Sequence, residues 1–410
     1  MTLRQTRVFL GIALFCLALA ASTGAVLRYG MVYGMPGWAA NFTAVRHAHS
    51  HLMYFGWVTL ALLALIWRGL PRLTGRTLSR WVPWQMAATA LLALISFPAF
   101  WANGYGLTQI GPAQLPLGSM VATFNGLTWF WFAWLYIRAT RGLADRPLPV
   151  QLWDWAIFLL MVASAGAVGL AGLVITGLAN IFLQQAFLHL FLDLFAVGWF
   201  TLAMLGLLWA QVDPARLPGW LPTQTLAIAL APTFILGMSP TMVTGRLFWP
   251  AALANLIGAG LIGVHLFGLW QRRDRLTSLF PFAALFLALH SLIALVLIWP
   301  GVWRWAGSTQ LRVFFLHNLL LGWTSTALLG LIWAMWGQRG ALQTGLGWVW
   351  QIGVAAMLLA LLGVGFTQFV PIPVPMLYRM AYWASLLVAG AAVGQLFMRE
   401  EEGEGRRLGE

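Results

Sequence analysis

Three segments of the chain share one pattern, a polar residue five positions before a Gly-Trp pair. These are His51 before Gly56-Trp57, Asp193 before Gly198-Trp199, and His317 before Gly322-Trp323. Each Gly-Trp pair leads into a similar apolar tail, so the segments repeat as units of structure. Imidazole nitrogen is a common ligand of transition metals and heme iron. The repeat therefore predicts nitrogen ligands at matched depth on related helices, as a metal or heme site requires.

A second level of histidines lies one helical turn earlier. His47 and His189 each stand nine residues before their glycine, four residues from His51 and Asp193 respectively. Residues four apart share a helix face, so two polar levels are stacked on equivalent faces. Asp193 allows two interpretations. It accepts a proton from the His189 imidazole and orients that ring as a ligand, or it is a neutral acid bonded to a neighbouring helix.

The composition indicates which elements carry these residues. Hydrophobic residues make up 61% of the 410 positions and charged residues only 8%, against about 25% charged in soluble domains. Lipid must therefore be the main solvent, and each helix that crosses it needs roughly 20 apolar residues. Twelve segments qualify: 7–27, 51–70, 81–101, 118–138, 153–178, 185–210, 220–240, 248–270, 277–299, 312–336, 347–369 and 376–398.

The sequence thus predicts an all-α polytopic membrane protein of about twelve transmembrane helices, arranged as three pseudo-threefold four-helix arcs. We expect a single transmembrane domain over 1–398, with repeat units at about 7–140, 151–271 and 277–398, and a disordered cytoplasmic tail over 399–410.

Arginine placement predicts the orientation. All 23 basic residues are arginine, and seventeen fall on one side of the twelve-span arrangement. The other side holds only Arg28, Arg46, Arg246, Arg304, Arg312 and Arg379. By the positive-inside rule this asymmetry places both termini in the cytoplasm of a bacterial-type inner membrane, and the candidate histidines in the outer part of that membrane. The net charge of +13 therefore reflects topology and lipid contact, and no nucleic-acid partner is expected.

Several classes of protein are disfavoured by what the sequence lacks. There is no phosphate-binding loop, no HExxH motif and no Cys-x-x-Cys-His motif, which argues against an ATP-driven pump, a zinc protease and a covalently attached heme. The single cysteine, Cys16, excludes a cysteine-rich metal site and an internal disulfide.

Other polar and aromatic residues have two interpretations each. Arg46 is either a charge-assisted partner of a heme propionate or an interfacial residue that snorkels. Trp57 and Trp323 either wall a flat cofactor or serve as packing. Lone membrane histidines such as His265 and His290 are more simply explained as hydrogen-bonded packing residues.

The segment Arg46-His-Ala-His-Ser-His51-Leu-Met-Tyr-Phe-Gly-Trp-Val, which continues to Leu70-Pro-Arg72, resembles a motif of the heme-copper oxidase subunit I superfamily. The chain also resembles the NnrS family of heme- and copper-containing membrane proteins linked to nitric oxide. That resemblance implies heme b with His51 (or His47) and His317 as axial ligands, and copper with His189 as a ligand. It also implies a redox partner such as a c-type cytochrome.

The chain also differs from the oxidases. It lacks their second histidine in span ten, their histidine pair in span seven and their His-Pro-Glu sequence in span six. A complete oxygen reductase is therefore not expected. The leading hypothesis is a heme-binding redox protein of the membrane, in electron transfer or in nitric oxide or oxygen handling, and an oxidoreductase activity stays open. A cofactor-free transporter and a non-catalytic assembly subunit are the alternatives.

Overall fold

The computed structural model describes residues 1–212, 217, 219–337, 340–369 and 371–398, and the tail 399–410 lies outside them. The chain divides into two compact units. Unit 1 holds residues 1–141 and 328–410, and unit 2 holds residues 142–327. The single domain and its three repeat units stay predictions.

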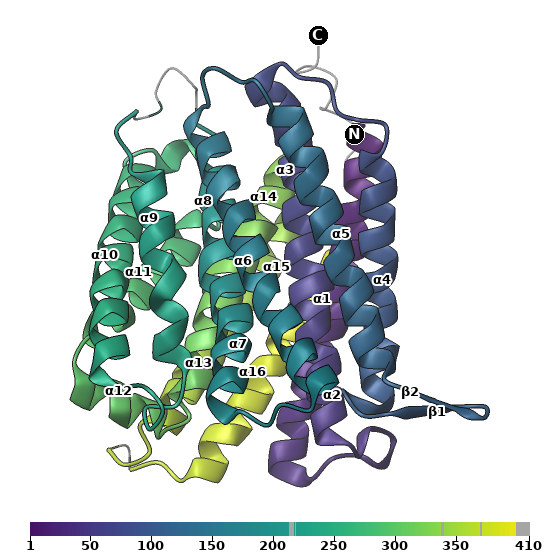
Figure 1. Ribbon diagram of the computed structural model, residues 1–410, viewed down its shortest axis with the longest axis vertical. Helices are drawn as coiled ribbons and strands as arrows, with labels where there is room; N and C mark the ends of the chain where they lie inside the picture. Colours follow the sequence, from purple (N-terminus) through teal and green to yellow (C-terminus); the bar gives the residue numbers. More distant parts are fainter. Residues whose placement is uncertain (213–216, 218, 338–339, 370, 399–410) are drawn as a thin grey trace. The chain divides into compact units, whose positions relative to one another are not determined.

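Unit 1 consists of helices and one short hairpin (Figure 1). In chain order its elements are α1 (Leu3–Tyr33), the 3₁₀ turn η1 (Gly37–Ala39), α2 (Phe42–His51), the π-helix η2 (Leu52–Thr59), α3 (Leu60–Thr74), α4 (Val82–Asn103), β1 (Thr108–Ile110), β2 (Ala113–Leu115), α5 (Leu117–Thr140), α15 (Ala341–Gly365) and α16 (Val374–Gln395). The strands pair antiparallel, with Gln109 opposite Gln114. Helix α14 (Thr326–Trp336) begins at the boundary between the units.

Unit 2 is entirely helical in the part that the structure describes. Its elements are α6 (Leu148–Thr176), α7 (Ile181–Asp193), the π-helix η3 (Leu194–Phe200), α8 (Thr201–Trp209), α9 (Thr223–Leu230), the 3₁₀ helix η5 (Ala231–Gly237), α10 (Gly245–Trp270), the 3₁₀ turn η6 (Arg273–Arg275), α11 (Phe280–Val296), α12 (Pro300–Gly307), α13 (Leu311–His317) and the π-helix η7 (Asn318–Ser325).

The prediction of an all-α polytopic membrane protein is confirmed. Among the described residues nine helices are long and apolar enough to cross a membrane, or ten if the bent pair α11 and α12 forms one span. Two predicted spans differ from these. The segment 220–240 forms a shorter helix, Thr223–Gly237, and α5, at 24 residues, is not among the nine. The count of twelve and the arcs stay predictions.

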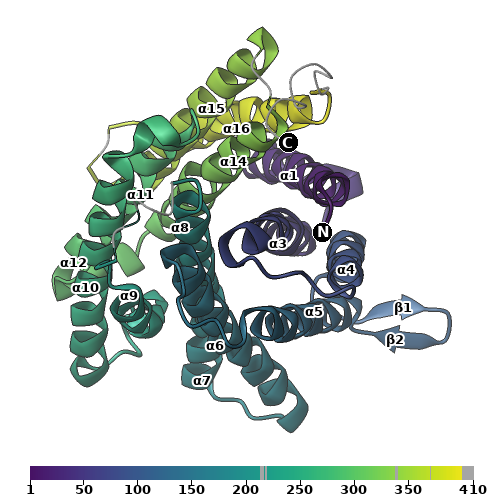
Figure 2. The same ribbon diagram turned by 90° about the horizontal axis from the view of Figure 1, so that it is seen from above.

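The buried centre of unit 1 is the continuous helix of α2, η2 and α3, against which α1 and α4 pack (Figure 2). Polar side chains link the helices around it. The Trp67 indole donates to Gln85 Oε1 at 3.2 Å, and Thr89 Oγ1 donates to Thr128 Oγ1 at 2.9 Å. Such bonds replace the hydrophobic drive that lipid does not supply, since lipid tails are as apolar as the helix surfaces. They hold α3, α4 and α5 together.

Candidate functional site

Each of the three repeat segments changes from α-helix to π-helix at the same point. The last α-helical residue is His51 before η2, Asp193 before η3 and His317 before η7. Each π-helix contains the Gly-Trp pair of its segment. The three segments thus make the same transition at the same position, and the candidate ligands stand at a break in regular helix. Wide π turns of this kind occur often at functional sites.

The His51 imidazole is held in a defined orientation in unit 1. Its Nδ1 lies 2.8 Å from the backbone oxygen of His47, one turn earlier. A carbonyl oxygen only accepts, so Nδ1 must carry the proton and Nε2 keeps its lone pair. The Phe100 ring stacks on the imidazole with centroids 3.7 Å apart. This tautomer, with Nδ1–H bonded to a carbonyl, is the one in which metal-binding histidines present Nε2.

Tyr105 makes a hydrogen bond with the other nitrogen of the His51 ring. Its hydroxyl lies 3.0 Å from His51 Nε2 and belongs to the loop between α4 and β1. Burial raises the pKa of Tyr105 to about 12, because the phenolate would lose its hydration. The hydroxyl therefore stays protonated near neutral pH and donates to Nε2. An iron atom at Nε2 would have to replace this hydroxyl.

His317 in unit 2 has the same internal geometry as His51. Its Nδ1 lies 2.7 Å from the Val313 backbone oxygen, again one turn earlier. The same reasoning assigns the proton to Nδ1 and the lone pair of the neutral ring to Nε2. Asn318, the next residue, is fully buried and donates through Nδ2 to the Phe286 backbone oxygen at 3.0 Å. This bond fixes the start of η7 against α11.

His47 and Arg46 lie on α2, one turn or slightly more before His51. The His47 ring is half-buried and meets the Tyr105 ring edge-on at 4.7 Å between centroids. Its centroid is 6.3 Å from that of His51, so the two rings belong to one cluster. Arg46 is exposed, an arrangement compatible with both interpretations of this residue.

Asp193 accepts two hydrogen bonds in unit 2. Its Oδ2 lies 2.7 Å from His189 Nδ1, as the first interpretation of this pair requires. Its Oδ1 lies 2.9 Å from Arg312 Nη2 on α13. Arg312 Nη2 also approaches His189 Nδ1 at 3.1 Å, but both groups are donors here, so the carboxylate is the acceptor that holds them together.

The partner on the neighbouring helix corrects the second interpretation of Asp193. That interpretation has a neutral acid bonded to a neighbouring helix, whereas the contact is an ion pair with a guanidinium. Gly237 makes the cluster possible, because a Cβ at this position would collide with Asp193 Oδ2 and crowd His189 Nδ1. Arg312 Nη1 also donates to the Gly237 backbone oxygen at 3.0 Å.

Sequence reasoning missed Arg312, which was interpreted only as a topology signal. A usable signal was present: Asp193 is the only acidic residue deep in any span, so it requires a partner, and the outer side holds few cations. Tyr105 was missed because its loop carries no recognisable motif.

The tryptophans of the Gly-Trp pairs are fully buried, namely Trp57, Trp199 and Trp323. A second set of three tryptophans stands ten residues further along the sequence, and each of them donates its indole N–H to a polar side chain on another helix. The bonds are Trp67 to Gln85 Oε1 at 3.2 Å, Trp209 to His265 Nδ1 at 3.2 Å and Trp333 to Gln395 Oε1 at 2.8 Å. The bond to Trp209 identifies His265 as a packing residue.

His49 and His290 also lie apart from the candidate ligands. His49 points away from the face of His51 and binds the Ala20 backbone oxygen on α1 through Nδ1 at 2.8 Å. His290 is buried, and its ring lies 4.3 Å from that of Phe315. Among the described residues no three His, Cys, Asp or Glu side chains form one metal-binding group. His47 and His51 belong to unit 1, and His189 and His317 belong to unit 2.

One cavity lies in unit 1 and another in unit 2, and no candidate histidine lines either of these two. Models of known protein families match no part of the chain, and a search of curated protein sequences finds no match. The resemblance to heme-copper oxidases and NnrS proteins therefore depends on the sequence motifs alone.

Proposed function

We propose that this chain is a heme-binding redox protein of the membrane, with His51 and His317 as iron ligands. The observation that carries the proposal is the geometry that the two residues share within their own units. Each imidazole donates Nδ1–H to the carbonyl one turn earlier, which leaves the lone pair of the neutral ring on Nε2. Each also stands directly before a π-helix. A bond from the second ring nitrogen to a carbonyl fixes ring orientation and raises ligand basicity.

The surrounding residues have defined tasks in this proposal. Phe100 holds the plane of the His51 ring by stacking on it. Tyr105 hydrogen-bonds Nε2, the ring nitrogen that would hold iron in place of this hydroxyl. Bound heme would supply one-electron transfer, or gas binding if one axial position stays open. Arg46 is the candidate propionate contact, Trp57 and Trp323 are the candidate walls, and His47 is the alternative ligand on α2.

The proposal extends to copper, topology and partners. His189, oriented by Asp193 at 2.7 Å, is the candidate copper ligand. Twelve spans in three arcs, both termini in the cytoplasm and an inner-membrane location complete the arrangement. The physiological reaction would be electron transfer, or nitric oxide or oxygen handling, with a c-type cytochrome or another redox subunit as partner.

A cofactor-free carrier or an assembly subunit is the second candidate, and one observation favours it. The Tyr105 hydroxyl already satisfies His51 Nε2 at 3.0 Å, so that ring needs no metal to be stable. A purely structural histidine would show the same bond.

Heme analysis of the purified protein and three variants tests the proposal. We expect extractable heme b in the wild type, and loss of heme or an altered spectrum in His51→Ala and His317→Ala. His49→Ala is the matched control, because His49 lies on the same helix as His51 and also binds a carbonyl through Nδ1, but on α1. Heme that is unchanged in all three variants would refute the ligand assignment, and a wild type without heme would favour the second candidate.

A further inference from the structure

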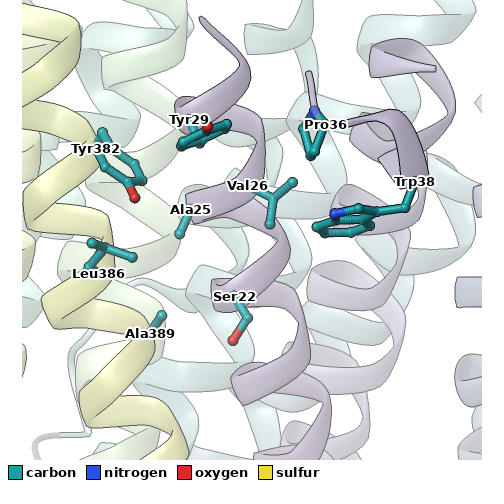
Figure 3. Close-up of a pocket in the computed structure, with 9 residues that line it drawn as sticks. All are labelled: Ser22, Ala25, Val26, Tyr29, Pro36, Trp38, Tyr382, Leu386 and Ala389. Atoms are coloured by element: carbon teal, nitrogen blue, oxygen red, sulfur yellow. The ribbon is translucent and has the colours of Figure 1, made fainter. Parts of the chain in front are cut away.

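A groove of about 420 Å³ lies between α1 and α16 in unit 1 (Figure 3). Residues from both helices and from the loop after α1 line it: Ser22, Ala25, Val26, Tyr29, Pro36, Trp38, Tyr382, Leu386 and Ala389. The lining is mainly apolar, and the hydroxyls of three of these residues add a few polar contacts. Its volume falls in the range of ~300–1,000 Å³ that is usual for small-molecule sites.

The groove begins at an aromatic belt. Trp38 is exposed and stacks on Trp101 at 6.1 Å between centroids. Tyr29, Tyr33 and Tyr382 form a second aromatic cluster beside it, with centroids 5.0–6.0 Å apart. Tryptophan and tyrosine collect where headgroups meet acyl chains. From this level the groove runs along α1 towards Ser22, about 10 Å deeper by the rise of a helix.

A buried cation lies near the same end of the groove. Arg28 on α1 is only 7% exposed and lies near Tyr378, one turn before Tyr382 on α16, although it is not itself one of the residues that line the groove. No aspartate or glutamate occurs in residues 1–144 or 328–399. The only carboxylate side chains of unit 1 therefore follow the far end of α16, while Arg379 adds a second, exposed cation beside Tyr378.

A buried guanidinium without a counter-charge is costly, and arginine cannot escape the cost by losing its proton. Since no described residue of unit 1 carries a carboxylate side chain, an anion from outside unit 1 would balance it. The groove is lined by apolar side chains below an aromatic belt, and positive charge lies at the level of the belt. This combination matches a molecule with an apolar chain and an anionic headgroup.

We propose that this groove binds an anionic phospholipid, with an acyl chain along α1 and α16 and the phosphate near Arg28. The site is independent of the proposed heme, because none of the candidate heme or copper ligands lines the groove. The bound lipid would join α1 to α16, the first and last helices of unit 1.

Native mass spectrometry with added lipids tests the proposal on the full chain in detergent. Phosphatidylglycerol and phosphatidylcholine with the same acyl chains serve as probes. We expect the wild type to bind phosphatidylglycerol at least tenfold more tightly, and Arg28→Gln to lose most of that preference. Arg304→Gln removes the same charge from an exposed outer residue and should keep the preference.

A second variant covers the case in which Arg28→Gln does not fold. Leu386→Trp fills the groove at a position that is 38% exposed, and it should weaken binding of both lipids without changing the charge. Equal binding of the two lipids by the wild type would overturn the proposal, as would an unchanged preference in Arg28→Gln. A co-purified quinone in place of phospholipid would also overturn it.

Discussion

The tautomer of the candidate ligands is set by their own helices. A histidine one turn after a backbone oxygen can donate Nδ1–H to it, as His51 and His317 do at 2.8 and 2.7 Å. The bond satisfies one ring nitrogen within the helix and aims the other away from the helix axis. No neighbouring helix is needed for this orientation, so it is encoded locally.

Tyr105→Phe separates the metal-binding interpretation from the structural one. If Nε2 is an iron ligand, loss of the competing hydroxyl should leave heme content unchanged or raise it. If His51 is only structural, the variant leaves a buried acceptor without a donor, at a cost of about 1–3 kcal/mol. Heme content and thermal unfolding, measured on the same preparation, distinguish the two. A variant that loses heme while its stability stays unchanged would contradict both interpretations.

Asp193→Asn should destabilise the protein by about 1.5–3 kcal/mol, because it weakens two charge-assisted bonds at once. We expect the loss of stability to be no larger than this because the Arg312 side chain is 40% exposed and partly hydrated. Arg312→Gln alone should cost a similar amount, and the double variant less than the sum. Asp154→Asn is the control. It weakens the ion pair with Arg146, in which the carboxylate is 28% exposed against 15% for Asp193, and should cost no more than about 1 kcal/mol. Additive losses in the double variant would show that the two residues are not coupled.

At the scale of the element, the glycine in each π-helix determines how closely that helix can pack against its neighbours. A Cβ at Gly56 would lie 2.7 Å from Cys16 Sγ, and Cβ atoms at Gly198 and Gly322 would press on Leu159 and Phe286. Each glycine thus lets a neighbouring side chain approach the π-helix closely. The recurrence of Gly-Trp in the sequence reflects this close approach.

Gly322→Ala should cost about 1–3 kcal/mol, since the Phe286 ring must shift in a packed core. It should also perturb the start of η7, where His317 stands. Gly390→Ala is the matched control, because a Cβ there meets nothing within 4 Å. Alanine at that position should be neutral or slightly stabilising. Thermal unfolding of both variants measures the difference, and equal effects would contradict the close-approach argument.

The sequence predicted the equivalence of the three segments, since the spacing to Gly-Trp is visible in one dimension. It did not predict the π-helices, because apolar residues on every face of a buried span hide the helical period. The ion pair of Asp193 joins residues 119 positions apart, and only tertiary structure brings them together. Within the predicted span 220–240 the α-helix gives way to the 3₁₀ helix η5 after Leu230, because η5 starts Ala231-Pro232 and proline weakens a continuing α-helix.

At the scale of the whole molecule, the arginine pattern and the fold of unit 1 agree that the start of α1 and the end of α16 lie at the same end. Antiparallel packing brings Ser22 beside Ala389 and Tyr29 beside Tyr382 (Figure 3). The start of α1 and the end of α16 therefore lie at the same end of unit 1. The positive-inside rule predicts that this end faces the cytoplasm.

Reporter fusions test this orientation. A fluorescent protein fused to either terminus should fluoresce, and alkaline phosphatase at the same sites should be inactive, because both termini are expected in the cytoplasm. Alkaline phosphatase inserted in the hairpin of β1 and β2 should be active, since the hairpin lies at the opposite end of unit 1 (Figure 1). Active phosphatase at either terminus would reverse or break the proposed topology.

The most direct test of the central claim is the reduced-minus-oxidised optical spectrum of the purified protein. If His51 and His317 bind iron, the wild type should show a Soret band and sharp α bands of heme b. Replacement of either histidine by alanine should shift or abolish these bands while His49→Ala keeps them. A wild-type spectrum without these bands, or bands unchanged in both ligand variants, would contradict the account.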